Sequence, residues 1–100
     1  MNNAKATRTV VVGNPNGLHV RPVEQIALLA GQFDANIEVI HESLRVNAKS
    51  ALNILTLGAQ QGATLVLEAT GRDAESALRA LAEIIESNIE ENETTSQNQS

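Results

Sequence analysis

The stretch Asn16-Gly17-Leu18-His19-Val20-Arg21-Pro22 decides how this chain is organised, because it joins a turn to the start of a helix. Asn-Gly favours a tight turn, and a proline near the first helical position loses no helical hydrogen bond. Apolar residues with helical spacing follow at Val23, Ile26, Ala27, Ala30 and Phe33, and Gly31 lies where the pattern ends. The stretch therefore predicts a loop that delivers His19 and Arg21 to a helix N-terminus.

These residue types at a helix start suit the chemistry of a phosphoryl group. Unpaired N–H groups and a partial positive charge at the N-terminus attract anions. The planar guanidinium of Arg21 can hold phosphate oxygens, and the imidazole of His19 is a nucleophile near neutral pH. Two interpretations of His19 stay open on these local grounds: a loop residue that caps the helix or bonds a neighbouring backbone group, and a residue that carries a phosphoryl group.

The rest of the pattern alternates strands and helices. Strands are predicted at 7–12, 37–40, 44–46 and 65–69, with Val10, Val12, Ile37 and Val39 facing inward. Helices are predicted from Pro22 to about Gly31, over 50–57, and from Ala74 to about Glu91 after an Asp73 N-cap. The buried stripe of the last helix is expected at Ala77, Leu78, Leu81, Ile84, Ile85 and Ile89.

This order, β-α-β-β-α-β-α, predicts an α+β fold of the open-faced β-sandwich type. A four-stranded antiparallel sheet would carry three helices on one face. We expect a flexible N-terminus over 1–6, one domain over 7–91 and a disordered polar tail over 92–100.

Composition excludes several classes of function. A net charge of −5 and a single aromatic residue, Phe33, argue against nucleic-acid binding. The chain has no cysteine, and His19 and His41 do not have metal-ligand spacing, so no metal site is expected. No apolar run is long enough for membrane insertion and no signal peptide is visible, so we expect a cytoplasmic protein.

A second motif, Asn47-Ala48-Lys49-Ser50, opens the short helix. Ser50 is interpreted either as a simple helix cap or as a phosphorylation target. If Ile54 and Leu57 face inward, Leu52 and Leu55 form an exposed apolar patch; the alternative is that they pack under a loop.

Both motifs together resemble the histidine-containing phosphocarrier protein family, HPr, of the bacterial phosphoenolpyruvate-dependent sugar phosphotransferase system. The resemblance rests on residues 17–22, on 46–50, on Leu57-Gly58-Ala59 and on the turn at 70–75, and it extends over about 7–91. It implies that His19 accepts a phosphoryl group on Nδ1 from phospho-enzyme I and passes it to an enzyme IIA, with Arg21 steadying the group. Such a protein is a carrier with a phosphohistidine intermediate rather than a stand-alone enzyme, and it needs no cofactor.

The resemblance also implies a regulatory role for Ser50, as a substrate of HPr kinase/phosphorylase. It places Gly17, Ala51, Leu52 and Leu55 on a partner-binding surface of a monomer. Five residues depart from the family's usual choices: Val20, Glu24, Leu28, Gly31 and Ala51. Glu24, Leu28 and Gly31 make this surface less positive than is usual in the family, and Ala51 is smaller than the usual residue. Two alternatives stay open: a mainly regulatory binding module that is not coupled to sugar uptake, and a nitrogen-related paralogue, against which the Lys49-Ser50 pair argues.

Overall fold

One antiparallel sheet of four strands organises the computed structural model, which describes residues 4–87. The strands are β1 (Lys5–Val11), β2 (Asn36–His41), β3 (Leu44–Asn47) and β4 (Thr64–Thr70), in the spatial order β1-β4-β2-β3. β4 pairs with both β1 and β2, and β3 returns along β2 after the turn at Glu42, whose φ is +58°. The last strand of the chain therefore lies between the first and the second.

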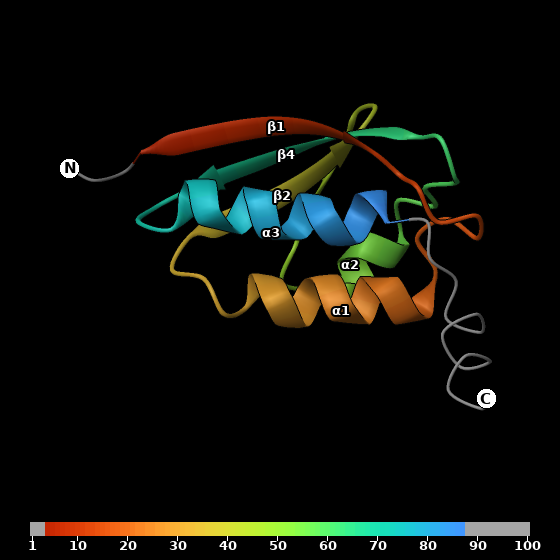
Figure 1. The fold of residues 1–100 in the computed structure, drawn as a ribbon, viewed down its shortest axis with the longest axis horizontal. Helices are drawn as coiled ribbons and strands as arrows, with labels where there is room; N and C mark the ends of the chain where they lie inside the picture. The colour runs from red at the N-terminus through yellow and green to blue at the C-terminus, as the bar shows by residue number, and fades with distance from the viewer. Residues whose placement is uncertain (1–3, 88–100) are drawn as a thin grey trace.

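Three helices cover one face of this sheet: α1 (Val20–Ala30), α2 (Ala51–Leu55) and α3 (Ala74–Glu86). Figure 1 shows the helices on the same side, with the sheet's other face left open. α3 packs against β1 and β4, while α1 packs against α3 and α2. The predicted α+β architecture and its order of elements are confirmed.

The core lies between the sheet and the helices. Alternate residues of the strands point into it, and Val10, Ile37, Val39, Leu65 and Leu67 are almost completely buried. The helices contribute a set of buried side chains that includes Val23, Ile26, Ile54, Ala77, Leu78, Leu81 and Ile85. The inward-facing residues predicted for the first two strands are therefore confirmed. Within residues 4–87, no helix combines the length and the apolar character that a membrane crossing requires.

The first strand begins earlier than its alternating pattern predicts. β1 starts at Lys5 rather than Thr7, because Lys5 and Ala6 continue the ladder opposite Thr70 and Ala69 of β4. The expected flexible segment 1–6 is thus wrong at these two positions, and residues 1–3 lie outside the described part. β4 is long enough to pair with both of these residues, and this pairing cannot be inferred from the local sequence of β1.

α2 is shorter than the predicted helix over 50–57. Ser50 is its N-cap, and the helix ends after Leu55. The N–H groups of Leu57 and Gly58 bond the carbonyls of Ile54 and Leu55, three residues back, so the chain tightens into a turn. Leu57 is still buried, as the pattern predicts.

The ends of α3 also differ from the prediction. Ser87 has extended backbone and closes the helix, which was expected to run to about Glu91, and the Gly13 N–H donates to the Ile85 carbonyl at this end. Asp73 occupies the predicted N-cap position, but its side chain makes no capping bond. Its Oδ2 instead accepts from the Asp34 N–H at 2.7 Å. Ile89 and the expected polar tail lie outside the described residues.

Candidate functional site

The loop before α1 is shaped by Asn14, a buried polar residue. Its side-chain Oδ1 accepts from the Asn16 N–H at 2.8 Å, and its carbonyl accepts from the Gly17 N–H at 2.8 Å. These two bonds close the turn that the Asn-Gly pair predicts. The next two residues then lead directly into α1.

Gly17 holds the loop against the segment between α2 and β4. Its φ is +71°, and a Cβ there would lie 2.6 Å from the Ala59 carbonyl oxygen. That same oxygen accepts from the Leu18 N–H at 3.0 Å. Glycine is thus required twice, by the left-handed backbone and by the close approach. Gly17 is buried in this contact, so its expected place on a partner-binding surface is corrected.

The beginning of the loop is fixed by α3 and by the turn before β4. The Gly13 N–H donates to the Ile85 carbonyl at 3.0 Å, and the Gly62 N–H donates to the Val12 carbonyl at 2.8 Å. Gln61 Nε2 donates to the Gly13 carbonyl at 3.2 Å. The loop is therefore anchored at both ends to parts of the chain that are distant in sequence.

His19 is the N-cap residue of α1. Its carbonyl accepts from the Val23 N–H at 3.1 Å, while its imidazole makes no capping hydrogen bond and is half-buried. His19 thus occupies the cap position that the local interpretation gives it, but it caps the helix with its backbone and not with its side chain. The imidazole lies at the positive end of the helix dipole. Arg21 follows in the first helical turn with an exposed side chain, so the structure brings the two predicted residues to one helix end.

Ser50 caps α2 through its side chain. Its Oγ accepts from the Asn53 N–H at 3.2 Å, and its carbonyl accepts from the Ile54 N–H at 3.1 Å. The preceding Asn47 Oδ1 accepts from the Lys49 N–H at 2.9 Å. The capping interpretation of Ser50 is therefore confirmed.

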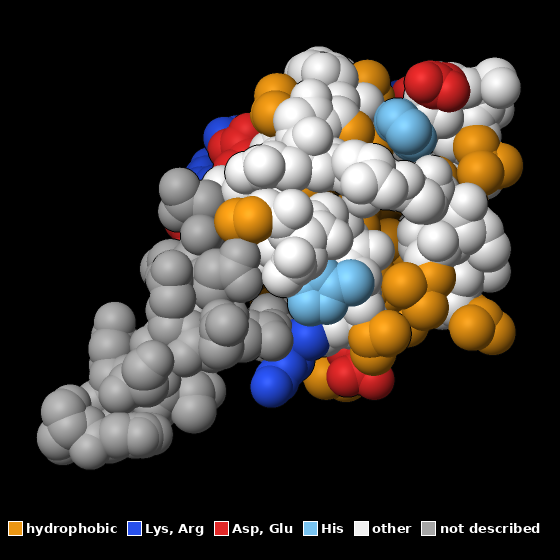
Figure 2. Space-filling model, turned by 90° about the vertical axis from the view of Figure 1, so that its right-hand side faces the viewer, with side chains coloured by type: hydrophobic (Ala, Val, Ile, Leu, Met, Phe, Trp, Pro, Cys, Tyr) orange, Lys and Arg blue, Asp and Glu red, His pale blue; other side chains and the backbone are white. Residues whose placement is uncertain are grey.

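Apolar side chains are exposed beside the histidine. Leu52 is 72% exposed, so the predicted exposed apolar residue is confirmed there. Ala51 and Leu55 are half-buried and pack against the core, so Leu55 follows the packing alternative in part. α1 adds Val20 and Leu28, whose exposed fractions are 56% and 72%. Figure 2 shows this end of the molecule, where hydrophobic side chains gather near a histidine and basic side chains. The contribution of Val20 was missed, although Val20, Glu24 and Leu28 follow one another at four-residue intervals in the sequence.

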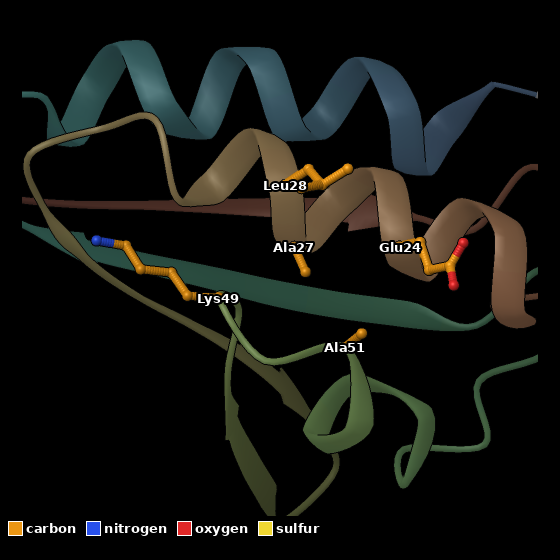
Figure 3. Close-up of a pocket in the computed structure, with 5 residues that line it drawn as sticks. All are labelled: Glu24, Ala27, Leu28, Lys49 and Ala51. Atoms are coloured by element: carbon orange, nitrogen blue, oxygen red, sulfur yellow. The ribbon is translucent and has the colours of Figure 1, made fainter.

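A shallow pocket separates α1 from α2. Its volume is about 410 Å³, and it is lined by Glu24, Ala27, Leu28, Lys49 and Ala51 (Figure 3). The lining is mostly apolar with one charged group at each end. Among residues 4–87, no group of three or more acidic, histidine or cysteine side chains is arranged to hold a metal ion.

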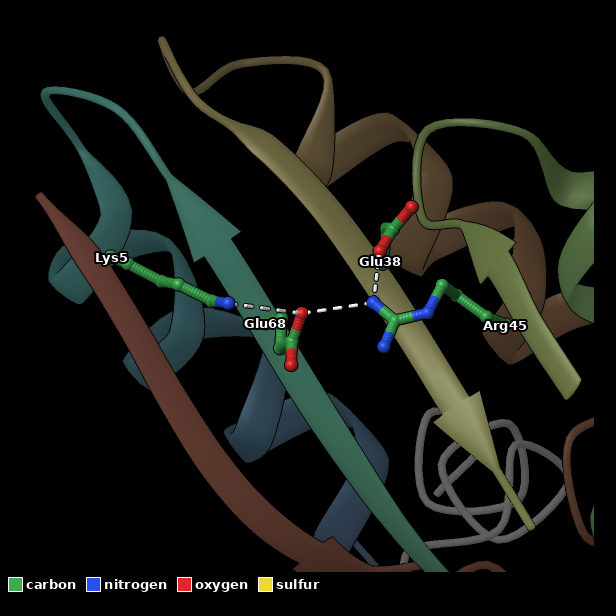
Figure 4. Close-up of polar contacts among 4 residues, drawn as sticks. All are labelled: Lys5, Glu38, Arg45 and Glu68. Atoms are coloured by element: carbon green, nitrogen blue, oxygen red, sulfur yellow. Dashed lines mark hydrogen bonds and ion pairs between the residues drawn. The ribbon is translucent and has the colours of Figure 1, made fainter. Parts of the chain in front are cut away.

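The ionisable groups whose pKa is shifted lie on the open face of the sheet, away from this helix end (Figure 4). A hydrogen bond from Arg45 lowers the pKa of the Glu68 carboxyl, partial burial opposes that shift, and Lys5 adds to it. The hydrogen bond to Glu38, and then the one to Glu68, raises the pKa of Arg45. This network stabilises charged forms across the sheet and takes no part in the site beside His19.

Comparison with known proteins agrees with this geometry. The family model for the "PTS HPr component phosphorylation site" matches residues 6–87. The chain is 34% identical to a phosphocarrier protein NPr from Shewanella violacea, over 87% of this chain and 96% of the relative. It is 40% identical to a phosphocarrier protein HPr from Buchnera aphidicola, over 76% of this chain and 89% of that one.

Solved structures give the same result. A crystal structure of a phosphocarrier protein HPr from Bacillus anthracis superposes with a TM-score of 0.79 at 36% identity, covering 83% of this chain and 99% of that one. The four-stranded antiparallel open sheet with three helices, in the order β-α-β-β-α-β-α, is the architecture of these HPr structures. The chain therefore belongs to the HPr family of phosphocarrier proteins of the phosphotransferase system.

Proposed function

We propose that His19 is the phosphoacceptor of this carrier. The observation that carries the proposal is that His19 caps α1 with its backbone alone, which leaves its imidazole available at the positive end of the helix. Nδ1 attacks the phosphorus of phospho-enzyme I, a new N–P bond forms, and the bond to the enzyme I group breaks. The same group then passes to an enzyme IIA by the reverse sequence of bond changes, which leaves the imidazole unmodified.

Arg21 steadies the phosphoryl group in this proposal. Its guanidinium lies in the first turn of α1 and can donate two parallel hydrogen bonds to phosphoryl oxygens. The stabilisation must stay incomplete, because a carrier has to release the group readily. An exposed arginine at a helix start, rather than a buried charge cage, suits this requirement.

Ser50 is the proposed regulatory site, phosphorylated by HPr kinase/phosphorylase. The added phosphoryl group brings about −1.5 to −2 charges to the start of α2, directly beside the exposed Leu52. Ala51, Leu52 and Leu55 would dock enzyme I, enzyme IIA and the kinase in turn, through small transient contacts. Modification of Ser50 would then change docking through charge. We expect the carrier to act as a monomer in the cytoplasm.

The test compares the two histidines of the chain. His19→Ala should abolish labelling by enzyme I with phosphoenolpyruvate, whereas the matched His41→Ala should label at the wild-type level. Separate incubation with HPr kinase and ATP, read by mass spectrometry, should modify Ser50 in the wild type and leave Ser50→Ala unmodified. Persistent labelling of His19→Ala would refute the phosphoacceptor. Labelling at Ser50 without any at His19 would favour the regulatory module instead.

A further inference from the structure

One exposed stripe runs along α1 toward its C-terminal end. Val20, Glu24 and Leu28 are four residues apart, so they lie one above the other on the same helical face. Val20 and Leu28 are 56% and 72% exposed, and Glu24 between them is exposed as well. A helix in water does not need two large apolar side chains on its outer face. Together with Leu52 of α2, they form a surface suited to a partner.

The pocket between α1 and α2 lies beside this stripe. Leu28, Ala27 and Ala51 supply its apolar lining, and the side chains of Glu24 and Lys49 lie at opposite ends (Figure 3). Its mouth is open, so an apolar side chain from another protein could enter without rearrangement of either helix. The pocket therefore has room for an apolar side chain of a partner.

The charge at the end of the pocket toward the start of α1 is negative. The Glu24 carboxylate forms no ion pair with any other residue in the range 4–87. Lys49 does not offset it, because its Nζ donates to the Phe33 carbonyl at 3.2 Å and points away from Glu24 (Figure 3). A phosphoryl group on His19 would add further negative charge at this end of the helix.

We propose that the phosphoryl donor of this carrier docks with an apolar side chain in the pocket and a lysine or arginine opposite Glu24. This inference rests on the proposed function, since it concerns the protein that loads His19. A cation opposite Glu24 pairs with a carboxylate that this chain leaves unpaired, and charge pairs at an interface rim mainly accelerate association. Glu24 thus selects a donor whose contact surface is basic at this point.

The test measures the rate at which enzyme I from the same genome, charged with phosphoenolpyruvate, phosphorylates limiting carrier. Glu24→Arg should lower the second-order rate constant about tenfold at low ionic strength. The rate constant of Glu24→Gln should lie between those of Glu24→Arg and the wild type. The matched control Glu83→Arg makes the same charge change on an exposed position of α3 and should keep the wild-type rate. Added salt should narrow the difference between Glu24→Arg and the wild type.

The outcomes separate this inference from the function on which it rests. A Glu24→Arg carrier that is loaded at His19 as fast as the wild type, or faster, overturns the basic docking surface while the phosphoacceptor stands. A similar loss in Glu83→Arg also overturns it, because overall charge would then explain the effect. A wild type that enzyme I does not label at all overturns the proposed function. Circular dichroism of each variant confirms that the fold is unchanged.

Discussion

At the residue scale, two glycines with left-handed backbone allow the cost of backbone strain to be measured separately from the cost of a close contact. Gly17 and Gly58 have φ of +71° and +59°, but only Gly17 lies against another segment, at Ala59. Gly58→Ala should lower the free energy of unfolding by about 1–2 kcal/mol, the cost of a left-handed alanine. Gly17→Ala should lower it by about 3 kcal/mol, because the added methyl also displaces the Ala59 carbonyl. Urea denaturation measures both, and equal losses would contradict the packing role of Gly17.

At the element scale, α2 is attached to the core through one fully buried side chain, Ile54. Ile54→Ala should cost about 2–5 kcal/mol of unfolding free energy, since it leaves a cavity under a helix of one and a half turns. Leu52→Ala removes a similar apolar volume from the same helix but should cost less than about 0.5 kcal/mol, because Leu52 is 72% exposed. Thermal or urea unfolding of the two variants measures this difference in unfolding free energy. A large loss in Leu52→Ala would show that this side chain packs rather than faces partners.

At the scale of the whole molecule, a charge network crosses all four strands. Arg45 of β3 bonds Glu38 of β2 and Glu68 of β4, and Lys5 of β1 lies 3.8 Å from Glu68 (Figure 4). The pKa of Glu68 is lowered by folding, so its contribution is present above the ordinary value of 4.5 and is lost as the pH falls through the folded-state pKa. Arg45 stays charged throughout this range. The urea midpoint should therefore fall less steeply between about pH 6 and pH 3 in Arg45→Gln than in the wild type. Arg79→Gln on α3, which has no ion pair within 4–87, should keep the wild-type slope, and an unchanged slope in Arg45→Gln would contradict the account.

Local patterns predicted the elements and placed His19 and Arg21 at the start of one helix, and contacts between distant residues explain what the patterns missed. Alternation placed Ile37 and Val39 inward, and the Asn-Gly turn placed His19 at the start of α1, because both depend on neighbouring residues. The order β1-β4-β2-β3 was not predictable in this way, since it depends on pairing between residues far apart in sequence.

The same physical reason applies within the site. Gly17 is buried because it packs against Ala59, and the Gly13 N–H donates to a carbonyl at the end of α3. Neither contact could be inferred from adjacent residues. Asp73 lies at the predicted N-cap position, but its carboxylate accepts a hydrogen bond from the Asp34 N–H instead of capping α3. The tertiary contacts thus decided which local tendency was expressed.

The most direct test of the central claim is the position of the phosphoryl group on the wild-type chain. The protein is incubated with enzyme I and phosphoenolpyruvate, and the modified residue is located by tandem mass spectrometry under conditions that preserve phosphohistidine. The account predicts a single phosphoryl group, on His19. A phosphoryl group on His41 or on any other residue, or an unmodified chain beside an active enzyme I, would contradict it.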